Sequence, residues 1–308
     1  MNAIAVTNVT KRFGDVTALD DLSLTVEDGE IFGFLGPNGA GKSTTINLLL
    51  DFIRPTSGSV SVLGMDAQEE SKQIRQRLGV LPEGFTTYDR LTGRQHLEFA
   101  IESKGTNDDP DALLERVGLS AEDGDRKTGG YSKGMAQRLL FAMSMVGDPD
   151  MLILDEPSTG LDPNGAREMR QLIREENERG TTIFFSSHIL EQVEAVCDRV
   201  GIIRDGEMVA IDSVEGLRDS VSTSGRLLIE VDRVDEGGLE AVRALDGLSA
   251  VEVLENAGGE GQTVAVETEG SKTAVLGALE DAGIVVEDFS TEEASLDEVF
   301  RQYTEVPA

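Results

Sequence analysis

The chain has 308 residues and carries 58 acidic side chains against 27 lysines and arginines, a formal net charge of −31 at pH 7. This charge excludes nucleic acid as an expected partner, because a phosphate backbone would repel it. No apolar run reaches the roughly 18 residues that span a membrane, and the N-terminus lacks a signal-peptide core, so we expect a soluble cytosolic protein. The single cysteine, Cys197, excludes an internal disulfide and a cysteine-based metal site.

The acidic residues are spread along the whole chain, arginine outnumbers lysine, and tryptophan is absent. This composition resembles that of proteins from halophiles that keep molar salt in the cytosol. At about 1 M salt the Debye length falls to roughly 3 Å, which screens the repulsion between surface carboxylates. A specific cationic partner is the competing explanation, and the even spread of the acids favours the halophile.

The first 218 residues alternate strand-like and helical patterns. The continuous apolar run at 31–35 and the strand-like segments at 151–155 and 181–187 predict buried parallel strands. A helix is predicted from Lys42, after the first run, and another over 164–178, between the second and third. This alternation predicts an α/β domain with a mostly parallel sheet.

Two further regions complete the expected organisation. Between about 84 and 147 strand signals vanish and a capping box at Thr92 and Gln95 opens a helix, which predicts a helical insert in the first domain. Over 225–308 the order strand, helix, strand, strand, helix, strand predicts a small ferredoxin-like α+β domain. A short helix is expected at 295–304. Nothing in this second domain resembles a catalytic constellation, so we expect it to regulate or stabilise.

The segment GPNGAGKST fits the pattern G-x-x-x-x-G-K-[ST] between a predicted buried strand and a predicted helix, which indicates a P-loop. Its glycines allow the backbone to wrap phosphates with its amides pointing inward. Lys42 is predicted to reach the β- and γ-phosphates, and Ser43 to hold Mg²⁺. We expect the whole segment to contact a nucleotide: Gly36, Pro37, Asn38, Gly39, Ala40, Gly41, Lys42, Ser43 and Thr44.

Three polar side chains follow two of the other predicted strands, at the strand ends where parallel sheets bind ligands. Asp155 is predicted to hold Mg²⁺. Glu156, on the other face of the strand end, is predicted to act as the base that polarises the attacking water. His188 is predicted to hydrogen-bond the γ-phosphate. His96 has no such context and is expected at the surface or in packing.

A second anion site is predicted at the start of the helix that begins near Lys133 in GGYSKGMAQRLLFAMSMV. Ser132 occupies an N-cap position and Gly134 lies in the first turn, so the backbone amides there are little covered by side chains. This site follows the P-loop by about ninety residues, which raises the question of what a second anion site would bind.

Together these motifs resemble the nucleotide-binding subunit of an ABC transporter over residues 4–218. The resemblance implies a P-loop NTPase of ABC type, with a mostly parallel sheet, an antiparallel β edge and the helical insert. YSKGM stands at the family's signature, STGLD at its D-loop and LPEG at its Q-loop. Glu83 replaces the usual Q-loop glutamine, keeps an oxygen for Mg²⁺ and is expected to take part in catalysis. Phe13 stands where the family stacks an aromatic ring on adenine.

The resemblance implies hydrolysis of ATP with Mg²⁺ by a homodimer, or a pair of ATPase subunits, arranged head to tail. The signature of one cassette then closes on the γ-phosphate held by the other. The residues acting in trans would be Ser132, Lys133, Gly134 and Asp162. A separate integral-membrane permease would hold the chain at the inner face of the cell membrane, with Tyr88 and Leu91 in the groove that receives its coupling helix.

A repair or chromosome-maintenance ATPase is an alternative within the superfamily, but it would carry hundreds of coiled-coil residues in place of 45–130. A translation factor usually has two cassettes per chain, and a metabolic kinase has no use for YSKGM. A single cassette with a small tail ending in SLDEVF resembles the ATPases of type-2 exporters, including drug-resistance and sodium-extrusion pumps. It also resembles the ATPase that serves copper-site maturation of nitrous oxide reductase. The permease chooses the substrate, so the sequence leaves it open.

Overall fold

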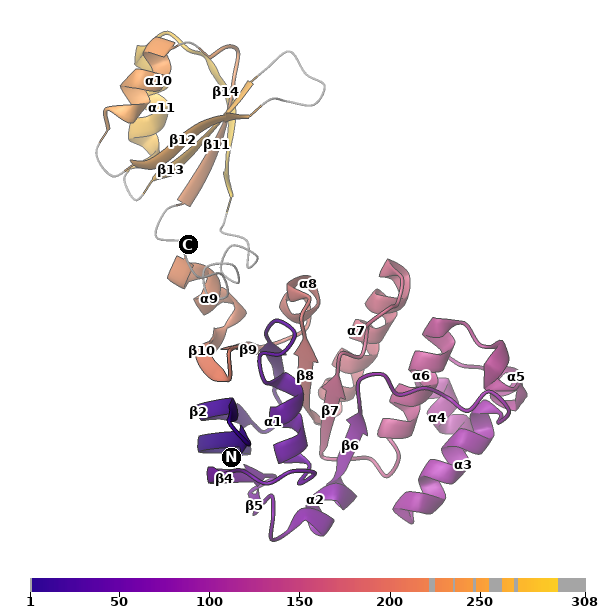
Figure 1. The fold of residues 1–308 in the computed structure, drawn as a ribbon. Coiled ribbons are helices and arrows are strands. Elements are labelled where there is room, and N and C mark those ends of the chain that lie inside the picture. The colour runs from indigo at the N-terminus through magenta and orange to yellow at the C-terminus, as the bar shows by residue number, and fades with distance from the viewer. Residues whose placement is uncertain are drawn as a thin grey trace. The chain divides into compact units, whose positions relative to one another are not determined.

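The computed structural model describes residues 2–221, 225–234, 236–245, 248–254, 262–268 and 271–292 (Figure 1). Contacts divide the chain into two compact units, a cassette unit up to Val214 and an accessory unit from Glu215. This division falls shortly before the predicted domain end at residue 218. Among the described residues, none of the helices is long and apolar enough to cross a membrane.

One sheet of the cassette unit is antiparallel, with the strand order β2-β1-β4-β5. Its strands are β1 (Asn2–Phe13), β2 (Val16–Glu27), β4 (Ser57–Val62) and β5 (Met65–Asp66). In β2, buried Leu22, Leu24 and Val26 alternate with exposed residues, because only one face of this sheet packs on the core. This sheet is the predicted antiparallel β edge.

The second sheet has the order β10-β9-β3-β8-β7-β6 and is parallel except for β10, which runs antiparallel to β9. Its strands are β3 (Ile31–Leu35), β6 (Leu78–Leu81), β7 (Met151–Asp155), β8 (Thr182–Ser187), β9 (Arg199–Arg204) and β10 (Glu207–Ser213). β3, β7 and β8 are buried along their whole length, as predicted. The rings of Phe32 and Phe184 stack within this core, 5.9 Å apart.

The two helices predicted for the first domain outside the insert are present as α1 (Lys42–Leu49) and α7 (Pro163–Glu178). The structure adds α2 (Ser71–Arg77), α8 (Leu190–Glu194) and α9 (Val214–Val221), which were not predicted. Asp162 caps α7 by accepting the Gly165 N–H at 2.8 Å, and Pro163 occupies the first turn, where a missing N–H costs nothing.

The helical insert is confirmed, since every residue from 84 to 147 is described and none lies in a strand. It contains α3 (Gly93–Lys104), α4 (Pro110–Arg116), α5 (Ala121–Asp125), the 3₁₀ turn η1 (Thr128–Gly130) and α6 (Lys133–Ser144), drawn in magenta tones in Figure 1. The predicted capping box is present. Thr92 Oγ1 accepts the Gln95 N–H, and Gln95 Oε1 accepts the Thr92 N–H.

Two basic side chains join the insert to the sheet core. Arg116 at the end of α4 pairs with Glu176 of α7 at 2.5 Å and with Asp148 at 3.0 Å. Lys104 at the end of α3 donates to the carbonyl oxygens of Leu78 and Val146 at 3.0 and 2.6 Å. Burial lowers the pKa of Lys104.

The accessory unit has the predicted order of strands and helices. Its elements are β11 (Gly225–Val231), α10 (Glu236–Arg243), β12 (Leu248–Leu254), β13 (Gln262–Thr268), α11 (Lys272–Asp281) and β14 (Val286–Glu292). The antiparallel sheet has the order β12-β13-β11-β14, and α10 and α11 pack together on one face of it (Figure 1). Leu227, Ile229 and Val266 are buried beneath them. The helix predicted at 295–304 lies outside the described residues.

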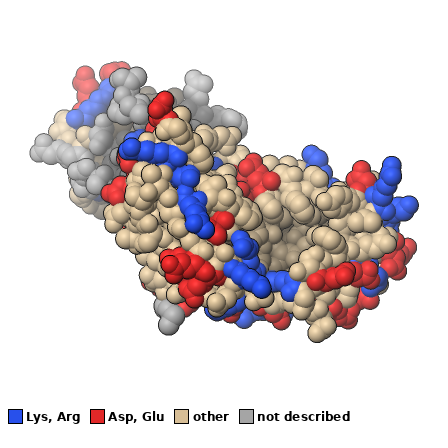
Figure 2. All heavy atoms as spheres, turned by 60° about the horizontal axis from the view of Figure 1, so that its bottom comes forward, with Lys and Arg blue, Asp and Glu red and all other residues tan. Residues whose placement is uncertain are grey.

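The surface agrees with the even spread of charge along the sequence. On the face drawn in Figure 2, acidic and basic side chains are interspersed rather than gathered into regions of one sign. That face therefore offers no concentrated acidic patch of the kind that a specific cationic partner would need.

Candidate nucleotide-binding and catalytic site

The P-loop joins β3 to α1 and borders a cavity of about 320 Å³. The cavity is lined by Ala18, Pro37, Asn38, Gly39, Gly41, Lys42, Ser43, Thr44, Glu83 and Glu156. Glu83 follows β6 and Glu156 follows β7, so the parallel sheet brings both carboxylates to the phosphate-binding loop.

Glycine is needed in this loop for two different reasons. Gly39 and Gly41 have φ values of 85° and 114°, in the left-handed region that side chains avoid. At Gly36 the constraint is space, because a Cβ there would lie 2.5 Å from the carbonyl oxygen of Ile203. Gly36 and Ala40 do not line the cavity. Ala40 is buried and supports the loop from within.

The start of α1 supplies the positively charged groups of the site. Its N-cap is Gly41, which provides no side-chain acceptor, so the amides of the first turn are unpaired by any cap. Lys42 is buried, donates to the Gly36 carbonyl oxygen at 2.6 Å and lies 3.7 Å from Glu156 Oε1. Bare amides, the helix dipole and an ammonium group at one point suit a chain of phosphates.

Asp155 is the buried acid at the end of β7. The Ser186 hydroxyl donates to its Oδ1 at 2.5 Å. Burial raises the pKa of Asp155, and the nearby carboxylates of Glu83 and Glu156 raise it further. A bound cation would reduce the repulsion between these carboxylates.

The residues present fit Mg²⁺ bound together with a nucleotide. In the described part of the chain, no group of three or more His, Cys, Asp or Glu side chains forms a metal cage of its own. Mg²⁺ needs no such cage, since it is usually bound through one or two carboxylates plus substrate phosphates and water. Asp155 and Glu83 offer carboxylates, and the exposed Ser43 offers a hydroxyl on the cavity wall.

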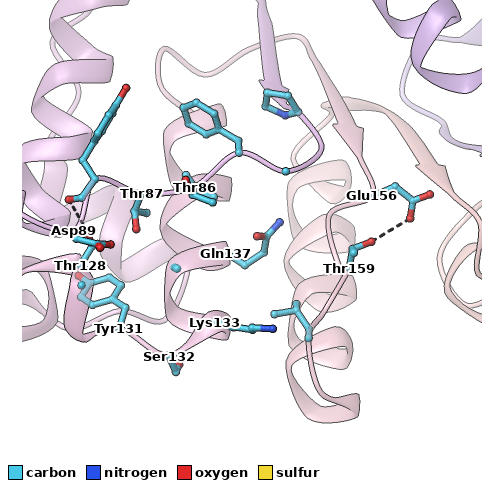
Figure 3. A pocket seen from close by; sticks show the side chains of 18 of the residues that line it. Thr86, Thr87, Asp89, Thr128, Tyr131, Ser132, Lys133, Gln137, Glu156 and Thr159 are labelled. Atoms are coloured by element: carbon cyan, nitrogen blue, oxygen red, sulfur yellow. Dashed lines mark hydrogen bonds between the residues drawn. The ribbon is translucent and has the colours of Figure 1, made fainter.

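Glu156 has a left-handed backbone, with φ at 52°, although it is not a glycine, which costs about 1 kcal/mol. Its N–H donates to both the carbonyl and the hydroxyl oxygens of Ser186 at 3.2 Å. The Nδ1 atom of His188 lies 2.9 Å from each of its carboxylate oxygens. The Thr159 hydroxyl donates to Oε2 at 3.2 Å (Figure 3). The backbone of Glu156 is therefore strained, and its buried carboxylate is held in one direction by these contacts.

A second and larger cavity, of 870 Å³, opens beside the signature helix α6. Its walls come from the segment 82–90, from the start of α6 and from the segment 155–161, and Figure 3 shows Ser132 and Lys133 on one side with Glu156 and Thr159 on the other. Ser132 caps α6 by accepting the Met135 N–H at 3.2 Å, as predicted, and its hydroxyl hydrogen stays available for a ligand. No residue of the YSKGM segment lines the P-loop cavity.

Three other residues singled out in the sequence are placed as follows. Phe13 ends β1 with 49% of its surface exposed, beside Lys11 and outside the lining of the P-loop cavity. Asp162 caps α7. His96 is buried in packing: its Nδ1 pairs with the Thr92 carbonyl oxygen at 2.7 Å, and its Nε2 accepts the Tyr88 N–H at 2.9 Å.

Sequence patterns missed the residues that hold Asp155 and Glu156 in place. Ser186 faces Asp155 because β7 and β8 pair in parallel with these two residues in register. Thr159 reaches back to Glu156 through the turn between β7 and α7. The position of Ser186 near the end of a predicted strand, two residues before His188, was the only hint that it lies in the site. Its pairing with Asp155 could not be predicted, because it depends on the register between the two strands.

The fold and the two cavities define a P-loop ATPase cassette, and comparisons give the family. Residues 19–159 match the family described as ABC transporter, and residues 213–304 match that described as ATP-binding protein DrrA1-3-like, C-terminal domain. The chain is 36% identical over 308 residues to the daunorubicin resistance ATP-binding protein DrrA3 of Streptomyces coeruleorubidus, covering 98% of this chain and 96% of that protein.

Two further similarities support the same family. The chain is 41% identical over 250 residues to a fluoroquinolones export ATP-binding protein of Mycobacterium tuberculosis, covering 80% of this chain and 82% of that protein. A solved ATP binding subunit of an ABC transporter superposes with a TM-score of 0.64 at 27% identity, covering 71% of this chain and 93% of that one. The chain therefore belongs to the ATP-binding subunits of ABC transporters, and the predicted family and fold class are confirmed.

Proposed function

We propose that this chain hydrolyses ATP with the help of Mg²⁺ and thereby drives a separate membrane permease that exports its substrate. The observation that carries the proposal is the cavity shared by Lys42, Glu83 and Glu156. It combines a phosphate-binding loop with two carboxylates, which is what hydrolysis of a nucleoside triphosphate requires.

In this proposal the residues in and near the P-loop cavity have the following tasks. The amides of the P-loop and Lys42 bind the phosphates, while Ser43, Asp155 and Glu83 would hold Mg²⁺. A bound metal would supply positive charge that offsets the charge developing on the phosphates. Glu156 orients the attacking water and accepts its proton, His188 supports Glu156 and faces the γ-phosphate, and Phe13 offers its exposed ring to adenine.

The signature segment acts on a nucleotide held by a second copy of the chain, or by a paired subunit. Ser132 and Lys133 line a cavity other than that of the P-loop, and Gly134 follows them in the first turn of α6. This helix start combines a hydroxyl, a positive charge and backbone amides with little side-chain cover. An anion site with no phosphate-binding loop of its own is suited to a phosphate brought by a partner. Asp162, at the start of α7, is assigned to the same interface.

The permease is expected to insert a coupling helix beside the segment 82–90, where the cavity of 870 Å³ opens. Phe85 and Tyr88 are 45% and 64% exposed there, and Leu91, the next residue after this segment, is 38% exposed. This attachment would keep the chain at the inner face of the cell membrane.

Export of a drug-like compound is the transport direction and substrate class that the relatives favour. Two of the most similar proteins are named for daunorubicin resistance and for fluoroquinolones export, and the match to the DrrA-like C-terminal family covers the accessory unit. We also propose that the chain works at high salt, because its charge of −31 is spread over the whole sequence.

The experiment that tests the proposal compares two variants of the purified chain in high salt. Glu156→Gln should lower Mg²⁺-dependent ATP turnover by ~10²–10⁴-fold while ATP binding is retained, because only the base is lost. Lys42→Ala should weaken ATP binding itself, because a phosphate counter-charge is removed. ATP hydrolysis by Glu156→Gln at the parental rate would show that Glu156 is not the base.

A further inference from the structure

We infer that Gln192 of α8 is a positioning residue for Glu156, holding together the two loops that grip the Glu156 carboxylate. The inference rests on the proposed role of Glu156 as general base. Gln192 lies outside the linings of both cavities described above, so it is not expected to touch the nucleotide.

The first observation is a chain of contacts that closes on itself. The Ser158 hydroxyl donates to Gln192 Oε1 at 2.5 Å, and the Ser187 hydroxyl lies 3.4 Å from the same oxygen. Thr159, next to Ser158, donates to one Glu156 oxygen, and His188, next to Ser187, contacts both. Gln192 therefore links Ser158 to Ser187. The residues that follow these two serines, Thr159 and His188, contact Glu156.

The second observation is burial. Gln192 is 8% exposed, Ser158 3% and Ser187 0%, so these polar groups have little access to water. A buried hydroxyl that loses its acceptor costs free energy, which makes the Ser158–Gln192 bond hard to give up. The turn after His188 is fixed as well, since the Ile189 N–H donates to Ser187 Oγ at 3.0 Å.

The third observation is the backbone of Glu156. A non-glycine residue with φ at 52° persists only where surrounding contacts over-determine it. Its N–H is held by Ser186, and its carboxylate by His188 and Thr159. If Gln192 releases the loops carrying Thr159 and His188, the carboxylate loses the contacts that aim it at the water.

The test compares variants of the full chain. Gln192→Met keeps the side-chain length and removes the acceptor, and we expect it to lower kcat by roughly 10-fold to 100-fold, as small misplacements of catalytic groups do. The dissociation constant for ATP should stay within about twofold, because the P-loop is untouched. Gln192→Glu, which keeps an acceptor oxygen for Ser158, should recover most of the lost turnover. Gln171→Met, the same change at an exposed position of α7, is the matched control and should behave as wild type.

Ser158→Ala breaks the same bond from the other side with a smaller change, so it replaces Gln192→Met if that variant fails to fold. A double-mutant cycle then identifies the route of the effect. If Gln192 acts through Glu156, Gln192→Met should cause no further loss of turnover in the Glu156→Gln background.

Two results would overturn the inference. One is wild-type kcat in both Gln192→Met and Ser158→Ala while Glu156→Gln is inactive, which leaves the proposed base intact but Gln192 without a role. The other is an undiminished loss from Gln192→Met in the Glu156→Gln background. A fully active Glu156→Gln would instead contradict the proposed function itself, so the two failures are distinguishable.

Discussion

The Nδ1 atom of His188 lies 2.9 Å from both carboxylate oxygens of Glu156, joining the end of β8 to the end of β7. An ionised carboxylate only accepts hydrogen bonds, so Nδ1 is the donor in this contact. The histidine that the sequence assigned to the γ-phosphate is thus also the partner of the proposed base. Its role toward the phosphate stays a prediction.

Replacing His188 should therefore impair chemistry more than binding. We expect His188→Ala to lower kcat by about 100-fold, within the usual range for general acid–base groups, with the ATP dissociation constant nearly unchanged. Steady-state ATPase assays and equilibrium nucleotide binding measure the two effects. His96→Ala is the comparison, since His96 is buried in packing and its loss should lower the melting temperature. Full turnover by His188→Ala would refute the assignment.

If the signature segment acts on a nucleotide held by a second chain, two inactive variants should complement each other. Ser132→Arg should leave ATP binding by the monomer nearly unchanged but block ATP-dependent dimerisation and hydrolysis, because a bulky cation fills the start of α6. Mixing it with Lys42→Ala protein should restore part of the turnover, since each mixed dimer holds one complete site. Size-exclusion chromatography with ATP and ATPase assays of the mixture measure these outcomes. Loss of ATP binding in the Ser132→Arg monomer would assign the signature to the chain's own site.

The exposed apolar residues of the insert predict a contact with the permease. A Tyr88→Asp, Leu91→Asp double variant should no longer recover a co-expressed permease in a pull-down, because two charges would enter an apolar interface. Phe52→Asp, at a 65% exposed position of the cassette unit outside the insert, is the matched control and should leave recovery unchanged. Equal recovery by the double variant and the control would argue against this groove.

The Arg116–Glu176 pair predicts a large effect on stability away from the nucleotide. Glu176 is buried, and Arg116→Met removes its 2.5 Å partner and leaves only the longer 3.6 Å pair with Arg179, so the variant should lower the free energy of unfolding by about 3 kcal/mol. Arg167→Met, at an exposed position of α7, should change it by less than about 0.5 kcal/mol. Urea denaturation curves give both values, and a similar small change in the two variants would mean that the pair contributes little.

The net charge of −31 predicts that stability depends on salt. Raising KCl from about 0.1 M to about 2 M shortens the Debye length from roughly 10 Å to less than 3 Å and should raise the melting temperature, because carboxylate repulsion is screened. Thermal unfolding across the series measures the effect. A melting temperature that stays constant or falls would contradict the proposed adaptation to high salt.

Sequence patterns predicted most of the fold because they record local requirements. Buried parallel strands are rich in apolar residues, which marked β3, β7 and β8, and caps at Thr92 and Ser132 marked the starts of α3 and α6. The P-loop could be predicted because the positions that require glycine all lie within one short segment. The alternation of strands and helices was also enough to predict the order of elements in the accessory unit.

By itself, then, the sequence determined the class of protein, the phosphate-binding loop and the identity of the acids at the strand ends. Only the tertiary structure decided what those acids contact. The register of β7 against β8 sets Ser186 beside Asp155, and the turns after both strands bring Thr159 and His188 to Glu156. The packing of α8 puts Gln192 behind them. The contacts of Ser186 with Asp155, His188 with Glu156 and Gln192 with Ser158 join residues 31 to 34 positions apart. No periodicity in the chain records them, because they arise only when separate strands are paired and packed.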